Sequence, residues 1–241
     1  MIIIPARMDS TRFPGKPLVR IDGKEMILWV CERCSRVAET WVATPDRQLY
    51  NFVLSYGFNA IMTGDHPTGT DRIAEAIQTL NDKNDIYVNV QGDIPLVEEA
   101  DILNVMIEKK HHPKLVIGTM CRAEYNDKNT VKVVHNAGQL MYMTREGEAR
   151  FRQCGLYGFN RKELEAFSRV PNKSTLLEKY ENIEIMRFAE IGYPVKMIEI
   201  QGSPEVNEPD DICVVEWLIE EKRKEELQWN SKNLSNLNLL Y

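Results

Sequence analysis

Residues 1–18 read MIIIPARMDSTRFPGKPL, and this stretch decides how the rest of the chain is interpreted. The apolar run MIII is short, β-branched and followed by Pro5, which is typical of a buried strand that ends in a loop. That loop carries three cations, Arg7, Arg12 and Lys16. Like charges this close repel one another unless an anion lies among them, so the loop is expected to bind an anionic ligand.

The rest of the first half alternates between short apolar runs and stretches in which apolar residues have helical spacing. The runs are brief, β-branched and bounded by turn residues, which predicts buried strands at residues 1–4, 41–43, 60–62, 86–90 and 115–119. The stretches between them predict helices at residues 25–37, 46–56, 70–80 and 98–109. This alternation is typical of βαβ units, so we expect an α/β fold with a mostly parallel sheet and flanking helices.

The pattern changes after about residue 122. Two apolar runs around Asn136-Ala137-Gly138 predict a smaller antiparallel hairpin, at residues 131–135 and 140–143. Beyond it, we expect a strand at 156–159, a long helix at 176–191, a strand at 195–200 and a final helix at 210–227. Residues 1–227 are thus predicted to form a single α/β domain. The last residues, 228–241, lack periodicity and are expected to be a loosely held tail.

Composition limits the class of protein. With 241 residues, of which 43% are hydrophobic, the chain can build one large α/β domain. Its formal net charge of −6 argues against nucleic acid as a partner, because nucleic-acid-binding proteins usually carry a basic surface. No apolar segment is long enough for a signal peptide or a membrane span, so we expect a cytoplasmic protein that does not bind membranes.

The cysteines give no sign of a metal or disulfide framework. Five cysteines without framework spacing indicate reduced thiols. Cys31 and Cys34 form a CxxC motif, but it lies inside a predicted helix, and no second Cys or His pair has ligand spacing. We therefore interpret both as small side chains on a partly buried helix.

The loop after the first strand lies where open parallel sheets bind their ligands, beyond the carboxyl ends of the strands. Its sequence, PARMDSTRFPGKP, matches neither GxxxxGKS/T nor GxGxxG, which excludes a P-loop and a dinucleotide fingerprint. Its small and hydroxyl residues can let backbone N–H groups face a phosphate, while its cations supply charge. A solvated basic loop remains the alternative on these residues alone.

Several ordered motifs resemble those of the 3-deoxy-D-manno-octulosonate (KDO) cytidylyltransferases, the CMP-KDO synthetases. The resemblance begins in IIIPARMDSTRFPGKPLVRIDGKEMI and continues through WVATPDRQL, MTGDHPTGTDRIAEA, VNVQGDIPLV, GLYGFNRKELEAF, LEKYENIEIMR and VNEPDDI. It covers about residues 1–225 in the family's order. It implies a Rossmann-like fold of the nucleotide-diphospho-sugar transferase type. It also implies a reaction in which CTP and an eight-carbon ulosonic acid give a CMP-sugar and pyrophosphate.

The resemblance assigns the nucleotide to the first loop. Arg7, Ser10, Arg12 and Lys16 would hold the triphosphate, and Gln91 would read the edge of the base. The anomeric hydroxyl of the sugar would attack the α-phosphorus in line. Arg7, Arg12 and Lys16 would be catalytic by neutralising charge, because phosphoryl-group transfer depends mostly on positioning and electrostatics.

A second motif, HPTGTDR at residues 66–72, begins a predicted helix. By resemblance, Thr70 and Arg72 would contact the cytidine. The residues alone also allow a simple capping turn, in which Thr68 or Thr70 caps the helix and Asp71 lies in its first turn.

A metal site is expected where the strand at 86–90 ends. Asp93 is well placed there to hold Mg²⁺, which prefers one or two carboxylates with phosphate oxygens and water. A merely structural Asp93 that caps the following loop is the alternative. The family's second metal ligand is the first aspartate of VDTPEDL, and this chain has Asn207 there, whose uncharged amide should bind the metal more weakly. Glu208, Asp210 and Asp211 either compensate or serve the start of the final helix.

The sugar side departs most from the family. Gln153 stands where the family has a histidine, in RQCGLYGF against KHIGIYAY, while Tyr157 keeps the aromatic hydroxyl. Glu184 and Arg187 match the LExLR stretch and would face the sugar, although an ordinary amphipathic helix would also explain that segment. The segment before this strand lacks the family's longer Ser-Arg-x-Pro-Ile-Pro loop, and we expect Arg145 to stand for the arginine of that loop.

The expected partners are CTP, a ulosonic acid and a second copy of the chain. By resemblance, residues 123–160 would form a sugar-side and dimerisation subregion, with the hairpin at 131–143 as a contact in a homodimer. The departures on the sugar side leave two alternatives open. One, beside the expected enzyme for KDO or 8-amino-KDO, is a cytidylyltransferase for another ulosonic or nonulosonic acid. The other is a catalytically weak homologue that binds CTP or a CMP-sugar.

Overall fold

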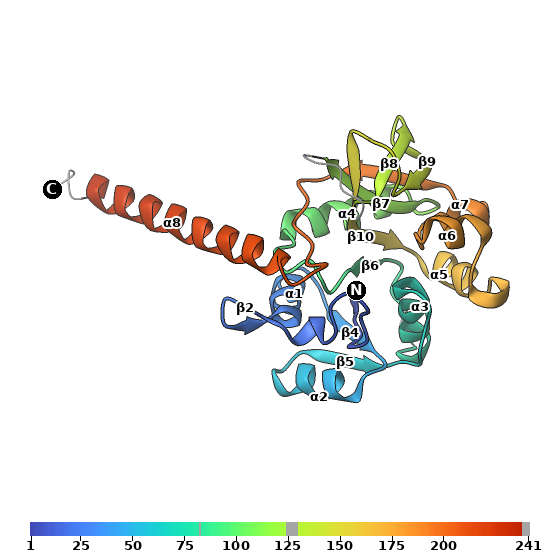
Figure 1. Cartoon of the computed structure of the whole chain (residues 1–241), viewed down its shortest axis with the longest axis horizontal. Helices are drawn as coiled ribbons and strands as arrows, with labels where there is room; N and C mark the ends of the chain where they lie inside the picture. Colours follow the sequence, from blue (N-terminus) through green and yellow to red (C-terminus); the bar gives the residue numbers. More distant parts are fainter. Residues whose placement is uncertain (82, 124–129, 238–241) are drawn as a thin grey trace.

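The computed structural model of the chain describes residues 1–81, 83–123 and 130–237 (Figure 1). Its first half alternates strands and helices as predicted. They are β1 (Ile2–Pro5), α1 (Met26–Ser35), β4 (Thr40–Thr44), α2 (Arg47–Ser55), β5 (Asn59–Met62), α3 (Gly69–Thr79), β6 (Tyr87–Val90), α4 (Glu99–His111) and β7 (Val116–Arg122). Between β1 and α1 lie the short 3-10 helix η1 (Lys16–Leu18) and a two-stranded ribbon, β2 (Arg20–Ile21) and β3 (Lys24–Glu25).

The second half contains the predicted hairpin and several shorter elements. They are β8 (Lys132–Asn136), β9 (Gln139–Thr144), β10 (Phe151–Phe159), α5 (Arg161–Ser168), η2 (Pro171–Lys173), α6 (Leu176–Glu181), α7 (Met186–Glu190), β11 (Val195–Glu199) and α8 (Asp211–Leu237). The turn between β8 and β9 has positive φ at Ala137 and Gly138, as a tight two-residue hairpin turn requires. The hairpin prediction is therefore confirmed.

A nine-stranded sheet forms the centre of the molecule, in the order β5-β4-β1-β6-β10-β7-β11-β9-β8. β5, β4, β1 and β6 pair in parallel, as do β7 and β11, but the pairings that involve β8, β9 and β10 are antiparallel, so the sheet is mixed and not mostly parallel as predicted. β10 is antiparallel to both β6 and β7 and lies between them. Residues 151–159 therefore enter the middle of the sheet beside β6 and do not extend an edge.

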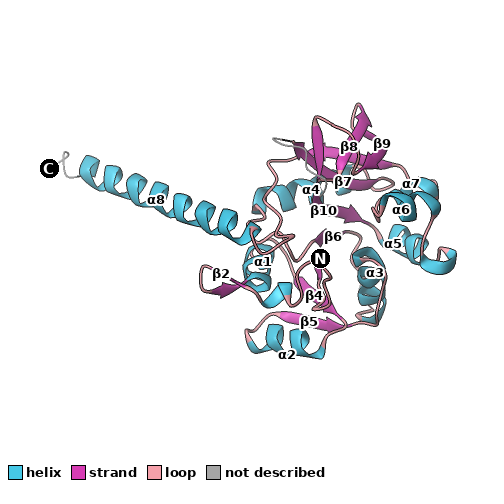
Figure 2. Cartoon of the chain, in the orientation of Figure 1, coloured by secondary structure: helices cyan, strands magenta, loops and turns pink. Residues whose placement is uncertain are grey.

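Helices cover both faces of this sheet (Figure 2). On one face, α3 and α5 bury Ile77 and Phe167 in the same apolar cluster. On the other face, α1 and α4 bury Ile27 and Val105. A third cluster joins the start of α8 to α1 and contains Val206. Two covered faces explain why the strands of the first half are continuously apolar.

Helix α5 was not expected from apolar spacing, but a capping signal precedes it. The side chain of Asn160 accepts a hydrogen bond from Glu163 N, and Glu163 in turn accepts one from Asn160 N, a capping box. Both oxygens of Glu163 also lie 2.7 Å from Lys109 Nζ, and both side chains are almost fully buried. This pair fixes α5 to α4.

The predicted helix at 176–191 is wrong, because the segment forms two short helices. Asn182 ends α6 in the left-handed conformation (φ 56°), which breaks the helical hydrogen bonding before α7 begins at Met186. Asparagine tolerates this conformation better than most residues. The break turns Glu184 toward the start of α3, where a continuous helix would not hold it.

The final helix is longer than predicted. It begins at Asp211, one residue after the predicted start, but it continues to Leu237 instead of ending at residue 227, and Figure 1 shows it extending away from the body. Residues 228–237 of the expected tail are thus helical, and 238–241 lie outside the described residues, as do 124–129 of the predicted sugar-side subregion. Within the described ranges, no helix is long and apolar enough to cross a membrane.

Candidate active site

The loop after β1 is held in place by a contact to the residue before α2 and by a contact within the loop. Met8 N donates to Asp46 Oδ2 at 2.7 Å, and Gly15 N donates to Met8 O at 2.9 Å. Gly15 has φ 73°, a conformation that glycine adopts without strain, and η1 begins at the next residue. The loop is thereby folded back so that Lys16 faces the carboxyl ends of β1 and β6.

Lys16 connects three segments at this edge. Its Nζ donates to Asp93 Oδ2 at 2.6 Å and to Val206 O at 2.9 Å. Val206 N in turn donates to Asp93 O at 2.9 Å. The predicted phosphate-binding cation and the predicted metal ligand are therefore in direct contact, and both side chains are partly buried, at 14% and 20% exposed.

A contact between Arg12 and Asn207 joins the loop after β1 to the segment before α8. Arg12 Nη2 donates to Asn207 Oδ1 at 3.0 Å. The nearby Asp211 accepts hydrogen bonds from the backbone N–H of Asn207 and of Glu208, at 2.7 and 2.8 Å. Of the two roles considered for Asp211, the structure shows the one at the start of α8, where a carboxylate satisfies free backbone donors.

The start of α3 is capped by Thr68, whose hydroxyl oxygen accepts a hydrogen bond from Asp71 N. Thr70 is fully buried and donates to Glu184 through both its hydroxyl (3.1 Å) and its backbone N–H (3.3 Å). Burial raises the pKa of Glu184, and the hydrogen bonds from Thr70 partly offset that effect. Thr70 thus orients Glu184 and lies outside the walls of both cavities described below, contrary to its predicted contact with cytidine.

Arg72 is the buried cation of the site, with 4% of its surface exposed. Its pKa is lowered first by burial and then by the positive charge of Arg7. Its Nε is buried and has no hydrogen-bond partner among the described residues. A desolvated guanidinium with an unused donor next to a second arginine is a favourable setting for an anion.

Two cavities adjoin at this edge of the sheet. One, of about 370 Å³, is lined by residues of the loop after β1, the start of α3 and the end of β6, among them Arg7, Ser10, Arg12, Lys16, Arg72 and Gln91. The other, of about 440 Å³, is lined on its far side by Arg145, Arg152, Gln153, Glu205 and Asn207. Arg12, Gln91, Asp93 and Glu184 line both. We call these the loop cavity and the β10 cavity.

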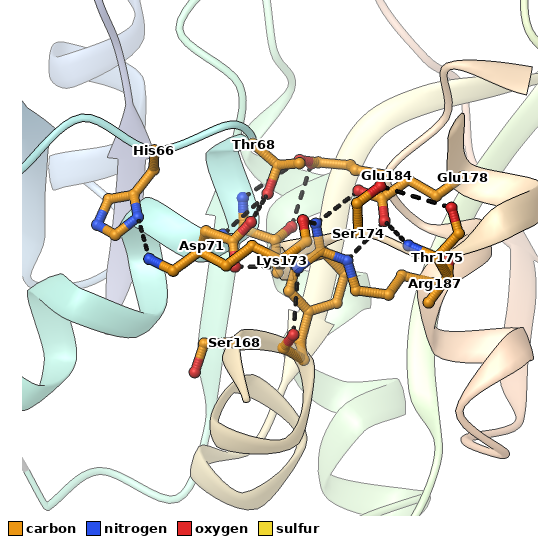
Figure 3. A network of polar contacts seen from close by, with 12 residues as sticks. His66, Thr68, Asp71, Ser168, Lys173, Ser174, Thr175, Glu178, Glu184 and Arg187 are labelled. Carbon is orange, nitrogen blue, oxygen red and sulfur yellow. Dashed lines mark hydrogen bonds and ion pairs between the residues drawn. The ribbon is translucent and has the colours of Figure 1, made fainter. Parts of the chain in front are cut away.

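Arg187 does not face either cavity, contrary to the expectation. Its guanidinium is fully buried and donates to both carboxylate oxygens of Glu178 (2.6 and 2.7 Å) and to Asp71 Oδ1 (3.0 Å). It also donates to the carbonyl oxygens of Phe167 and Lys173. Figure 3 shows this network joining the start of α3 to the segment that carries Glu184. Arg187 therefore holds together the elements on which the cavity wall is built.

A bulge in the middle of β10 determines how closely Gln91 approaches this strand. A register shift between Cys154 and Tyr157 produces a bulge opposite β7, and Gln91 N donates to Gly155 O. A Cβ at Gly155 would lie 3.1 Å from Gln91 Cβ and Oε1, so glycine lets Gln91 approach closely. Tyr157 is fully buried outside both cavity walls, and its hydroxyl has no hydrogen-bond partner in the described part of the chain.

Arg152 and Glu205 are charged cavity residues that were not predicted from the sequence. Arg152 immediately precedes Gln153 on β10, and Glu205 lies two residues before Asn207. Burial and the charge of Asp93 raise the pKa of Glu205 to about 6. Arg152 begins the segment RQCGLYGF and Glu205 directly precedes VNEPDDI, and this proximity to family motifs was the sequence signal for both residues.

The residues around Asp93 fit a magnesium ion. Asp93 Oδ1 is buried and has no hydrogen-bond partner among the residues described, although Oδ2 contacts Lys16. No group of three or more His, Cys, Asp or Glu side chains in the described ranges is placed as a metal cluster. Mg²⁺ does not need one, because one or two carboxylates are enough when phosphate oxygens complete its shell.

Comparison with known proteins places the chain in a family. The family model for cytidylyltransferases matches residues 1–199. A 3-deoxy-manno-octulosonate cytidylyltransferase of Escherichia coli is 36% identical over 228 residues, which cover 87% of this chain and 91% of that protein. An 8-amino-3,8-dideoxy-manno-octulosonate cytidylyltransferase of Shewanella pealeana is 37% identical over 240 residues, covering 89% and 96%. The chain therefore belongs to the cytidylyltransferase family and is a nucleotidyltransferase of the CMP-KDO synthetase type.

Solved structures agree with this assignment. The structure of CMP:2-keto-3-deoxy-manno-octonic acid synthetase complexed with CTP superposes with a TM-score of 0.83 at 33% identity, covering 92% of this chain and 98% of that one. A putative glucose-1-phosphate thymidylyltransferase from Bacillus anthracis has a TM-score of 0.67 at 13% identity, which shows a shared fold alone. The fold is thus the Rossmann-like, mixed α/β fold of nucleotidyltransferases.

Proposed function

We propose that this enzyme transfers CMP from CTP to KDO or 8-amino-KDO and releases pyrophosphate. The observation that carries the proposal is the pair of adjoining cavities, which share Arg12 and Asp93. A nucleotide in one and a sugar in the other would meet at these two residues. Relatives that act on each of the two sugars are similar to this chain over most of its length, which supports both as acceptors.

The loop cavity suits the triphosphate. Arg7, Arg12 and Lys16 line it together with Ser10, and the buried guanidinium of Arg72 adds a fourth cation. Charge-assisted hydrogen bonds from such donors are the usual means of holding phosphate groups. Gln91, at the end of β6, is the proposed contact for the cytosine edge.

The β10 cavity suits a sugar acid. Arg145 and Arg152 lie on its wall and offer donors for the carboxylate of a ulosonic acid. Gln153 and Glu184 offer hydrogen-bonding groups for the sugar hydroxyls. Burial, together with the charge of Arg12, lowers the pKa of Arg145. Two like charges facing one cavity again favour an anionic ligand there.

In the proposed reaction, the anomeric hydroxyl oxygen of the sugar forms a bond to the α-phosphorus of CTP. The bond from that phosphorus to the oxygen of the leaving pyrophosphate breaks, and the hydroxyl proton passes to solvent. Lys16 and Arg12 stabilise the charge that develops on the leaving group, which is the main contribution a protein makes to such transfers. Asp93, with Asn207 nearby, would hold Mg²⁺, which neutralises phosphate charge when bound.

We further propose that the enzyme works as a homodimer that uses the β8–β9 hairpin. Val134 and Met141 are large apolar side chains on this hairpin, and they are 48% and 61% exposed. Exposed apolar side chains at the end of a sheet suit contact with a second copy. If so, Val134→Lys with Met141→Lys should shift the mass measured by light scattering from dimer to monomer.

An acceptor panel tests the proposed activity. Pyrophosphate release is followed with CTP and Mg²⁺ and with KDO, 8-amino-KDO or sialic acid as the acceptor. Release with KDO or 8-amino-KDO but not with sialic acid supports the proposal. Release with sialic acid alone would assign a nonulosonic acid instead. Tight CTP binding without release for any acceptor would indicate a binding homologue and contradict the proposed activity.

A further inference from the structure

We propose that Glu205 supplies the second carboxylate of the magnesium site, in place of the charge that Asn207 lacks. This inference rests on the proposed function, because it concerns the ion that would accompany CTP. Glu205 lies directly before the VNEPDDI motif, and the proposed role is the one that the family's motif gives to the position of Asn207.

The backbone around Val206 places Glu205 at the site. Val206 N donates to Asp93 O and Val206 O accepts from Lys16 Nζ, so residues 205–207 lie directly along the turn that carries Asp93. The side chain of Val206 is fully buried in the apolar cluster beneath α8. Its two neighbours, Glu205 and Asn207, instead line the β10 cavity together with Asp93. The side chains of Glu205 and Asn207 therefore lie on the same cavity wall as Asp93.

The amide of Asn207 already has partners that do not suit a metal ligand. Its oxygen accepts a hydrogen bond from Arg12 at 3.0 Å. Its nitrogen lies 3.5 Å from Glu205 Oε2 and donates to it. The amide oxygen that would ligate a cation therefore faces a guanidinium, whereas the amide nitrogen supports the carboxylate of Glu205. In this arrangement Asn207 positions Glu205 and is not itself a metal ligand.

The charges around Asp93 also favour Glu205. Asp93 Oδ1 is buried without a hydrogen-bond partner within the described ranges, while Lys16 uses the other oxygen. Asp211, the other carboxylate near Asn207, is occupied by two backbone N–H groups. Glu184, on the same wall, accepts two hydrogen bonds from Thr70, and Glu208 follows Asn207, beyond the contacts that Val206 makes. Glu205, next to Val206, is therefore the acid on this wall that is placed to join Asp93. Two carboxylates with phosphate oxygens and water match the ligands that Mg²⁺ prefers.

Binding of Mn²⁺ to the full chain in the presence of CTP tests the assignment without relying on turnover. Free Mn²⁺ is measured by electron paramagnetic resonance for the wild-type protein and for Glu205→Gln, Glu205→Asp and Asn207→Asp. Glu199→Gln, an exposed glutamate at the end of β11, is the matched control. We expect Glu205→Gln to weaken Mn²⁺ binding by about tenfold or more, Glu205→Asp to retain most of it and Glu199→Gln to have no effect.

The double variant Glu205→Gln/Asn207→Asp separates a ligand from a structural residue. If Glu205→Gln weakens binding because it removes a charge, Asn207→Asp puts a negative charge back and the double variant should bind Mn²⁺ more tightly than Glu205→Gln alone. If Glu205→Gln weakens binding because it disturbs packing, Asn207→Asp should not restore it. Mn²⁺ binding by Glu205→Gln equal to that of the wild type would overturn the assignment. If the wild type also released pyrophosphate in the acceptor panel, only this inference would fall; without such release, the proposed function would fall as well.

Discussion

Lys16 Nζ lies 2.6 Å from Asp93 Oδ2, a contact that joins the loop after β1 to the turn after β6. The cation proposed to meet the pyrophosphate and the carboxylate proposed to hold the metal thus neutralise each other before substrate binds. Bound CTP and Mg²⁺ would replace this contact with two others, phosphate for Lys16 and metal for Asp93. The pair therefore keeps two opposite charges in place at modest cost in a partly buried site.

Replacing Lys16 should slow catalysis strongly. Lys16→Met removes the charge proposed to stabilise the departing pyrophosphate, and we expect kcat to fall by about 10²- to 10³-fold. Steady-state kinetics with saturating CTP measure this effect. Lys24→Met, which removes a cation from the β2–β3 ribbon, is the control and should leave kcat unchanged. A Lys16→Met enzyme within about twofold of the wild type would exclude the proposed role.

Arg187 should be essential to stability because it satisfies two buried carboxylates. Arg187→Met leaves Asp71 and Glu178 without their cation, which should lower the free energy of unfolding by about 3–5 kcal/mol. Urea denaturation measures it. The exposed Arg169, which pairs with Glu165 on α5, provides the control, and Arg169→Met should cost less than about 1 kcal/mol. Equal losses for the two variants would show that the buried network does not stabilise the fold.

The burial of Glu205 and its repulsion by Asp93 should make stability depend on pH when no metal is present. The pKa of Glu205 is raised from 4.5 to about 6, so between these values the folded state holds a proton that the unfolded state has lost. Stability should then fall as the pH rises through this window. Glu205→Gln lacks this titration and should be more stable than the wild type at pH 8, by about 1–2 kcal/mol.

At pH 4 the wild-type carboxyl is mostly protonated in both states, so the advantage of Glu205→Gln over the wild type should be smaller than at pH 8 by about 1–2 kcal/mol. Thermal unfolding in the presence of a chelator, at pH 4 and at pH 8, provides the comparison. A Glu205→Gln protein that is less stable than the wild type at pH 8 would show that the carboxylate is stabilised, not repelled, in its cavity.

Gly155 should control recognition of the nucleotide through Gln91. A Cβ at this position would lie 3.1 Å from Gln91 Cβ and Oε1, so Gly155→Ala must displace that side chain. We expect the KM for CTP to rise about tenfold, equivalent to about 1.4 kcal/mol. Gly64→Ala, whose Cβ would make only an ordinary contact at 3.6 Å, is the control. An unchanged KM for CTP in Gly155→Ala would remove Gln91 from the nucleotide site.

Local patterns in the sequence predicted most of the helices and strands, but they did not predict the order of the strands in the sheet. Alternating apolar runs and helical spacing located the strands and helices of the first half, and an Asn-Ala-Gly turn located the hairpin. The insertion of β10 between β6 and β7 depends on pairing between segments distant in the chain, which no local pattern records. The break at Asn182 was missed because one left-handed residue outweighs a favourable apolar spacing.

The candidate site was predicted in part, for a similar reason. The cations of the first loop were visible because their charges are clustered in the sequence. Arg187 was assigned to the sugar because a motif gives a residue's identity and not the direction of its side chain, and the fold buries this arginine. Glu205 was passed over because its approach to Asp93 arises from the backbone contacts of Val206.

The most direct test of the central claim is a ³¹P NMR measurement of CTP, Mg²⁺ and KDO incubated with the enzyme, repeated with 8-amino-KDO. The CTP signals should be replaced by those of one CMP-sugar phosphodiester and one pyrophosphate for each CTP consumed. Unchanged CTP with both sugars, or pyrophosphate accompanied by free CMP without a CMP-sugar, would contradict that claim.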